Sequence, residues 1–265
     1  MSCRTRPARA RKLVALGFSL VLPVGAACWG ARPEVGVVPG LRVSLPPFAG
    51  ADTVVYQRTI TRGGRDSASG TRTVVRSVVG ALDGPPLLQV EQRFPGGGGQ
   101  IVDTAVADFR TLRAVAHRSH QPKRTMRFDF VGDSAEGTVS ANGSTADTAR
   151  GTKDVRQALG GPLFDSNLLD LVVAALPLAP RFTAELPFFI YERGGRVPMP
   201  VTVRERARTA FPVLGNREVW VVSVGVPGAP ATVWVDAASK SVLRVRYDIA
   251  SAAMSVTDDR VTPIR

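Results

Sequence analysis

Apolar and polar residues alternate along much of the chain beyond residue 50, with the period of two that is typical of β-strands. The apolar residues of 126–130 all fall on one face, and those of 243–249 do the same. Segments 74–79 and 219–224 are apolar on both faces, so another element must cover the second side of the sheet there. Glycine-containing turns separate these runs at short intervals, which leaves no room for the crossover helices of a parallel sheet.

One helical pattern interrupts the strands. Its apolar residues recur at spacings of three and four: Leu168, Leu171, Val172, Ala175 and Leu176. Asp165 or Ser166 can cap the first amides of this helix, and Pro177 ends it. We therefore predict a mainly β (α+β) fold, a single curved antiparallel sheet or half-barrel of about ten strands, with one buried helix near 165–176 packed on its concave face.

Two hairpins share a sequence pattern. Val106-Ala107-Asp108 leads through a short turn into Leu112, and Val235-Asp236 leads through residues 237–241 into Leu243. In each, the Asp side chain can accept backbone amides of its own turn. We interpret this as the same type of hairpin turn occurring twice and not as a duplicated functional site.

The first 27 residues have the pattern of a secretory signal. A basic stretch from Arg4 to Lys12 contains no acidic residue, and the apolar run of 13–27 is too short to span a membrane comfortably. Small residues at 25–27 favour cleavage over an uncut signal anchor. Residues 24–28 resemble the lipobox of bacterial lipoproteins, with Gly25 where Leu is usual, so Cys28 is a candidate site of lipid attachment. Cleavage before Cys28 fits both the lipoprotein route and an ordinary signal peptidase, which could also cut a few residues later.

These segments predict the organisation of the chain. We expect a signal peptide at 1–27, a Pro/Gly-rich tether at 28–50, the half-barrel domain at 51–250 and a C-terminal tail at 251–265. The protein is then exported, to the periplasm or the outer membrane, and contacts a membrane through a lipid anchor if Cys28 is processed.

The positive charge does not indicate nucleic-acid binding. The chain has 34 Lys+Arg against 22 Asp+Glu, a net charge of +12, and removal of residues 1–27 takes away five positive charges, leaving 12 − 5 = +7. The remaining basic residues are spread along the chain instead of clustering in one helix or loop.

The sequence argues against most known types of catalytic and metal site, because residues that each type requires are missing. His117 and His120, the only histidines, fall on opposite faces of a strand and cannot chelate one ion, so we interpret both as exposed or edge residues. Gly132-Asp133-Ser134 resembles the nucleophile turn of GDSL-type hydrolases, yet no base histidine follows it. Asp258-Asp259 lies in the predicted polar tail. Phosphate-cradling and dinucleotide-binding glycine motifs are absent from the sequence. We predict a protein that is not an enzyme and has no metal or cofactor.

The hairpin of Trp234-Val235-Asp236 and 239–245, with the order of the preceding strands and helix, resembles the lipoprotein-carrier and lipoprotein-sorting superfamily (LolA and LolB-like) and the exported domains related to it. The resemblance spans about residues 51–249. It implies a half-barrel with a helix in its mouth and a lipid or acyl chain as cargo, but no fixed functional motif.

Side chains that would line such a cavity are aromatic or lie on the helix: Phe128, Phe130, Leu168, Leu171, Val172, Phe189, Trp220 and Trp234. The same residues at strand spacing also suit an ordinary core. The alternative is therefore a structural or interaction module of the cell envelope with a filled core, no ligand and an unspecified protein partner.

Overall fold

The structure, a computed structural model, describes residues 43, 50–80, 84–96, 98–142, 151–191 and 194–264. All of them belong to the second of two compact units of the chain, Val35–Arg265. The predicted signal peptide, Cys28 and the predicted tether, apart from Val43 and Gly50, lie outside the described residues. Val43 packs against the main hydrophobic core.

The described part of the chain contains fifteen strands, a helical segment between the ninth and the tenth, and a short 3-10 helix before the last. The first eight are β1 (Ala51–Arg62), β2 (Arg65–Val79), β3 (Leu87–Gly96), β4 (Gly99–Asp108), β5 (Ala114–His120), β6 (Arg124–Val131), β7 (Ser134–Ala141) and β8 (Thr152–Ala158). The short β9 (Phe164–Asp165) precedes the 3-10 helix η1 (Ser166–Leu168) and the α-helix α1 (Leu169–Ala175). The rest are β10 (Thr183–Ile190), β11 (Gly195–Phe211), β12 (Gly215–Val224), β13 (Ala231–Asp236), β14 (Val242–Ile249), the 3-10 helix η3 (Ala250–Ala252) and β15 (Met254–Arg260).

The strands form one sheet in the order β8-β7-β6-β5-β4-β3-β2-β1-β15-β14-β13-β12-β11-β10-β9. Neighbouring strands pair antiparallel, as predicted, except that β9 pairs parallel with β10. The predicted number of about ten strands was wrong. β8 has no buried face, and β9 is only two residues long, so neither carries the apolar alternation on which the prediction depended.

The C-terminal segment lies inside this sheet. The sequence analysis assigned residues 251–265 to a polar tail, but Met254–Arg260 form β15, which pairs with β1 on one side and β14 on the other. β15 thereby joins strands β1–β8 to strands β9–β14 in one sheet. Asp258 is thereby buried in the middle of the sheet and not exposed in a tail.

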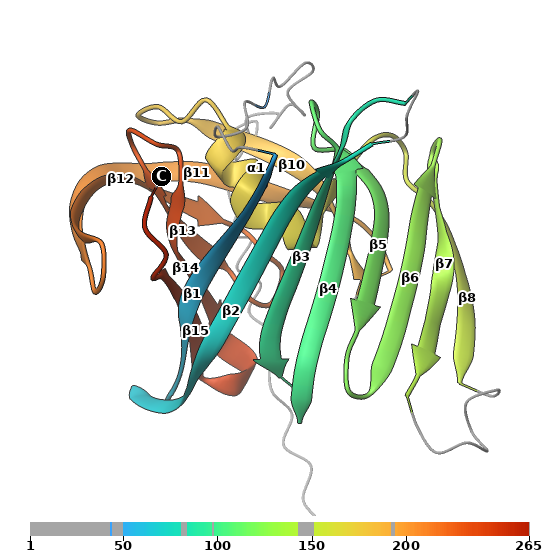
Figure 1. Ribbon diagram of the computed structural model, residues 1–265, viewed down its shortest axis with the longest axis horizontal. Coiled ribbons are helices and arrows are strands. Elements are labelled where there is room, and N and C mark those ends of the chain that lie inside the picture. Colours follow the sequence, from blue (N-terminus) through green and yellow to red (C-terminus); the bar gives the residue numbers. More distant parts are fainter. Residues whose placement is uncertain are drawn as a thin grey trace, which may run out of the picture. The chain divides into compact units, whose positions relative to one another are not determined.

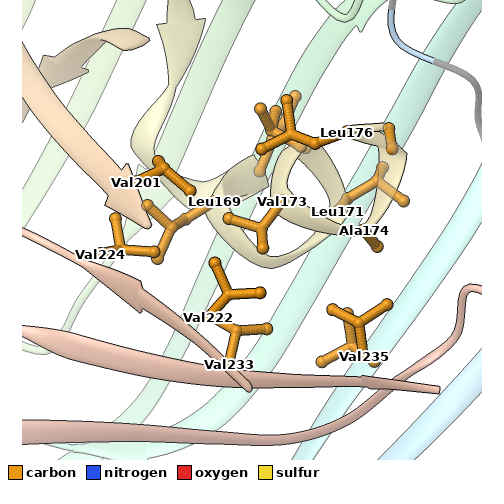
Figure 2. Close-up of a cluster of buried hydrophobic side chains, with 14 of the residues drawn as sticks. Leu169, Leu171, Val173, Ala174, Leu176, Val201, Val222, Val224, Val233 and Val235 are labelled. Atoms are coloured by element: carbon orange, nitrogen blue, oxygen red, sulfur yellow. The ribbon is translucent and has the colours of Figure 1, made fainter. Parts of the chain in front are cut away.

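The helical segment fills part of the concave face of the sheet (Figure 1). Asp165 caps η1 by accepting the Asn167 amide, as the sequence predicted, and α1 ends at Ala175. Most residues of η1 and α1 are buried in the main core with valines of β11, β12 and β13. Figure 2 shows Leu169 and Val173 facing these valines. The predicted single buried helix is confirmed, although its first turn is 3-10.

The two predicted Asp turns have the same structure. Asp108 Oδ1 accepts the amides of Arg110 and Thr111, at 3.0 and 2.8 Å. In the second turn Asp236 Oδ1 accepts the amides of Ala238 and Ser239 at the same two distances. Four residues after each Asp, Leu112 and Lys240 have positive φ angles of 58° and 59°. Because both loops close with the same bonds, the local sequence determines their conformation.

Candidate functional site

A row of polar side chains crosses the concave face of the sheet where strand alternation would otherwise place apolar ones. The polar row consists of Asp258 on β15, Arg58 on β1, Arg72 on β2, Gln92 on β3, Asp103 on β4 and Ser119 on β5, six strands that are neighbours in the sheet. Asp258 lies directly opposite Arg58, and Asp103 lies opposite both Gln92 and Ser119. The row therefore forms a continuous polar band next to the apolar core.

Four charged groups at one end of the polar row form a buried ion network. Arg58 donates from Nε and Nη2 to the two carboxylate oxygens of Asp258, at 2.7 and 2.8 Å. Arg72 donates to Asp170 of α1 at 2.8 Å and to Asp258 at 3.4 Å. Burial alone would lower the pKa of Arg72, but Asp170 and Asp258 raise it above its ordinary value. The network links helix α1 to strands β1, β2 and β15.

The middle of the polar row is hydrogen-bonded to η1, the start of the helical segment. Gln92 accepts from Arg72 Nε at 3.0 Å and donates its amide hydrogen to the Asn167 carbonyl. Asp103 accepts a hydrogen bond from the Ser119 hydroxyl. Burial raises the pKa of Asp103, and the Ser119 bond opposes that rise. Gln92 thus satisfies the Asn167 carbonyl of η1, whereas the buried Asn167 side-chain amide nitrogen has no hydrogen-bond partner among the described residues.

A second buried polar cluster lies beside the row. Asp165 Oδ2 accepts from the Tyr191 hydroxyl at 2.5 Å and lies 3.0 Å from His117 Nδ1. The His117 and Tyr191 rings stack with centroids 3.7 Å apart. The interpretation of His117 as an exposed or edge residue was wrong, because its face of β5 is covered by the segment that carries Asp165; His120 is exposed, as expected.

Two tyrosines flank the ion network: Tyr56 is buried and Tyr247 is partly buried. Burial raises the pKa of Tyr56 to about 12, and the negative charge of Asp170 adds to this rise. Burial also raises the pKa of Tyr247 to about 12, against the lowering effect of Arg72. Both phenols are therefore neutral at any physiological pH, and they supply apolar rings with one polar end.

The polar row borders an inner cavity of about 170 Å³. Its lining consists of Arg58, Arg72, Gln92, Phe94, Ser166, Asn167, Leu169, Asp170 and Tyr247. The lining thus combines both signs of charge, amide groups and two aromatic rings. The Arg58 guanidinium lies over the Phe94 ring, 4.4 Å from its centroid, which fixes both side chains at the rim of the inner cavity.

An outer groove of about 910 Å³ adjoins the inner cavity. Its lining comes from the ends of the β1–β2 and β3–β4 hairpins: Arg58, Ile60, Ala68, Ser69, Gly70, Thr71, Thr73, Arg93, Phe94, Pro95, Gly96, Gly98, Gly99 and Gln100. Arg58 and Phe94 line both spaces, so the two meet at these side chains. The lining of the outer groove contains two arginines and no acidic residue.

The outer groove exists because the β2–β3 ladder stops early. β2 pairs with β1 almost along its whole length, whereas it pairs with β3 only from Thr73 to Val79. The partner of Thr73 is Arg93, and Pro95 two residues later has no N–H to donate. The Pro95 ring also lies so close to Gly70 that a Cβ there would be 2.8 Å from it. The hydrogen-bonded pairing of the two hairpins therefore ends at Thr73 and Arg93, and beyond it they touch through Pro95 and Gly70.

The structure divides the predicted cavity-lining residues among three packed clusters. Leu168, Leu171, Val172 and Trp220 belong to the main core with α1. Phe128, Phe130 and Phe189 form a second cluster, in which the Phe128 and Phe130 rings lie 5.4 and 5.2 Å from the Phe189 ring.

Trp234 packs with a third cluster, that of Phe211, Val219 and Leu243. Strand alternation puts it on the opposite face from its core neighbours on β13. Of all the predicted lining residues, Leu171 also borders a small cavity of about 30 Å³, roughly the volume of one water molecule. The lining of an acyl cavity by these residues stays a prediction.

The sequence analysis did not find the polar row. A signal was present, because Arg58 follows Val54 and Tyr56 at the same two-residue spacing, and Gln92 follows Leu88 and Val90. A polar residue in an apolar strand face indicates either a buried network or a binding site. The ion partners lie up to 200 positions apart in sequence, so the network itself could not be derived from local pattern.

Among the described residues no group of three or more His, Cys, Asp or Glu side chains could hold a metal ion. In that same part of the chain, no helix has the length and apolarity needed to cross a membrane.

Residues 55–256 match the sequence profile of the family described as "Protein of unknown function (DUF3108)". No curated protein matches the chain in sequence. A solved structure similar to it is a beta-barrel-like protein of domain of unknown function DUF1849 from Brucella abortus, with 13% identity, a TM-score of 0.46, and coverage of 84% of this chain and 98% of that one.

Two further solved structures are similar at lower scores. A DUF1329 family protein from Desulfovibrio piger has 8% identity and a TM-score of 0.30, and the match covers 80% of this chain and 84% of that one. A protein from Bacteroides fragilis, described as exported and YmcC-like in fold, has 10% identity and a TM-score of 0.29, with coverage of 84% and 100%. The narrower resemblance to lipoprotein carriers stays a prediction.

Proposed function

The chain belongs to the DUF3108 family of proteins of unknown function, and we propose that it is an exported, non-enzymatic binding protein for a lipid. The observation that carries the proposal is the pairing of a polar inner cavity with an outer groove in which eight of the 14 lining residues are apolar or glycine, the two meeting at Arg58 and Phe94. A lipid has the same division into a polar headgroup and an apolar chain.

The size and chemistry of the outer groove support this function. Its volume of about 910 Å³ falls within the range of about 300–1,000 Å³ that is usual for ligand sites. Ile60, Ala68, Phe94 and Pro95 offer apolar contact, and Gly98 leaves open space where a Cβ would stand. The cavity proposed for the apolar chain thus differs from the one predicted from sequence, whose lining residues lie in packed clusters.

A groove-filling substitution tests the proposal. Ala68 lies exposed on β2 in the lining of the outer groove, where Ala68→Trp would fill the space while suiting a strand. We expect purified protein to bind a dansyl-labelled undecanoic acid and the variant to bind it at least about tenfold more weakly. Val131→Trp, at a position 65% exposed on β6, is the matched control and should bind like the unaltered protein. Equal affinity in all three proteins would exclude the outer groove as the binding site.

A second candidate function is a structural or interaction module of the cell envelope. The packing of α1 into the concave face supports it, because the main core is filled there by protein side chains. This alternative predicts no lipid binding by the folded protein, and no effect of Ala68→Trp on any activity in the cell.

Export and lipid anchoring at Cys28 complete the proposal. We expect the mature protein from the membrane fraction to have an intact mass raised by acyl chains, and Cys28→Ser to abolish the increase. A mature chain that starts at or after Cys28 and carries no lipid would make it a free periplasmic protein.

A further inference from the structure

The inner cavity is charge-balanced, and this limits the headgroup that it can hold. Arg58 and Arg72 supply two positive charges, and Asp170 and Asp258 supply two negative ones, all within one bonded network. Side-chain exposure in this network ranges from 0% for Asp258 to 13% for Asp170. A ligand group with a net charge would add an uncompensated charge to a largely buried site, which is costly.

Both signs of charge are nevertheless available to a ligand. Asp170 lines the inner cavity, and among the described residues its oxygens accept from Arg72 Nη2 and from the Leu171 amide, whereas an ionised carboxylate has about four acceptor positions. Arg58 uses Nε and Nη2 for Asp258, so Nη1 can donate to another acceptor. The cavity thus presents a carboxylate and a guanidinium as separate sites for the two ends of a zwitterion.

From this balance we infer that the inner cavity selects a phosphoethanolamine-type headgroup, a phosphate joined to a primary ammonium with no net charge. The inference rests on the proposed lipid-binding function. The phosphate accepts from Arg58 at the rim, where the apolar chain continues into the outer groove, and the ammonium donates to Asp170 further in. Gln92 and Tyr247 also line the inner cavity and add polar groups to it.

Three lipids with the same short acyl chains separate this inference from its alternatives. Displacement of the dansyl-labelled fatty acid from the full mature protein by phosphatidylethanolamine, phosphatidylglycerol and phosphatidylcholine measures headgroup preference. We expect phosphatidylethanolamine to bind about tenfold or more tightly than the other two, the worth of one charge-assisted hydrogen bond. Phosphatidylglycerol brings a net negative charge, and the trimethylated ammonium of phosphatidylcholine has no N–H to donate.

Asp170→Asn is the variant that tests the ammonium site. It should reduce the preference for phosphatidylethanolamine over phosphatidylcholine to about equality while fatty-acid binding persists, since the outer groove does not include residue 170. The ranking of the three lipids by the unaltered protein tests the inference even if this variant does not fold.

The outcomes are distinguishable. Equal binding of the three lipids, or tighter binding of phosphatidylglycerol, would overturn the headgroup inference and leave lipid binding intact. Failure of the fatty acid and of every lipid to bind would overturn the proposed function itself.

Discussion

At the scale of single residues, Asp258 holds together the two arginines of the polar row. Its two oxygens accept from Arg58 and Arg72, and its side chain has no exposed surface. A buried ion pair adds little net stability compared with apolar residues, but removal of one partner leaves the other charge without compensation. The loss of stability on removal of Asp258 therefore comes from the uncompensated charge of Arg58 and Arg72.

Asp258→Asn should lower the free energy of unfolding by about 3–5 kcal/mol. Its neighbour Asp259 points to the other face of β15 and pairs with the partly exposed Arg244, so Asp259→Asn should cost about 1 kcal/mol or less. Urea unfolding followed by circular dichroism measures both. A similar small loss in the two variants would mean that the network around Asp258 is not the buried contact described above.

The two tyrosines beside the network predict a loss of stability in alkali. The pKa of Tyr56 and of Tyr247 is about 12 in the folded chain and about 10 when unfolded, so the unfolded chain loses these protons first as the pH rises. Their contribution to stability is complete below pH 10 and is lost as the pH rises toward 12. Absorbance of phenolate at 295 nm should show two tyrosines that titrate only near pH 12 or on unfolding. Two phenols titrating near pH 10 in folded protein would contradict their burial.

At the scale of elements, the twin Asp turns show how far local sequence decides structure. Their loops were predicted from Asp108 and Asp236 alone, and both Asp side chains accept the expected amides. The helix near 165–176 and the antiparallel pairing were predictable for the same reason, since caps, spacing and turns are local signals. Strands without an apolar face carry no such signal.

Glycine substitution at the left-handed residues of the two Asp turns, Leu112 and Lys240, should have opposite effects. The positive φ of Lys240 is strained by about 1–2 kcal/mol, and Lys240→Gly relieves it at an entropic cost of about 0.5–1 kcal/mol, so a small gain in stability is expected. Leu112 has a similar φ angle but is completely buried, so Leu112→Gly should lose about 2–5 kcal/mol. Melting temperatures of the two variants provide the comparison. Destabilisation by Lys240→Gly equal to that of Leu112→Gly would contradict strain at residue 240.

At the scale of the whole described unit, sequence and structure agree on a curved sheet around a helix, and the site proposed from the structure lies apart from the residues that the sequence predicted to line a cavity. The sequence analysis looked for apolar cavity walls, and Phe128, Phe189 and Val172 lie in packed clusters. The candidate site depends instead on β15 reaching β1, since this pairing brings Asp258 opposite Arg58. Contacts between residues so distant in the chain follow from topology, which no local pattern contains.

The most direct test of lipid binding is native mass spectrometry of the mature protein purified from bacterial membranes without added lipid. The account predicts a one-to-one complex whose added mass, after extraction, corresponds to a phospholipid, with phosphatidylethanolamine enriched over its share in the membrane, and loss of the complex in Ala68→Trp but not in Val131→Trp. Protein that carries no lipid, and acquires none when mixed with phospholipid, would contradict the central claim and favour a module with a filled core.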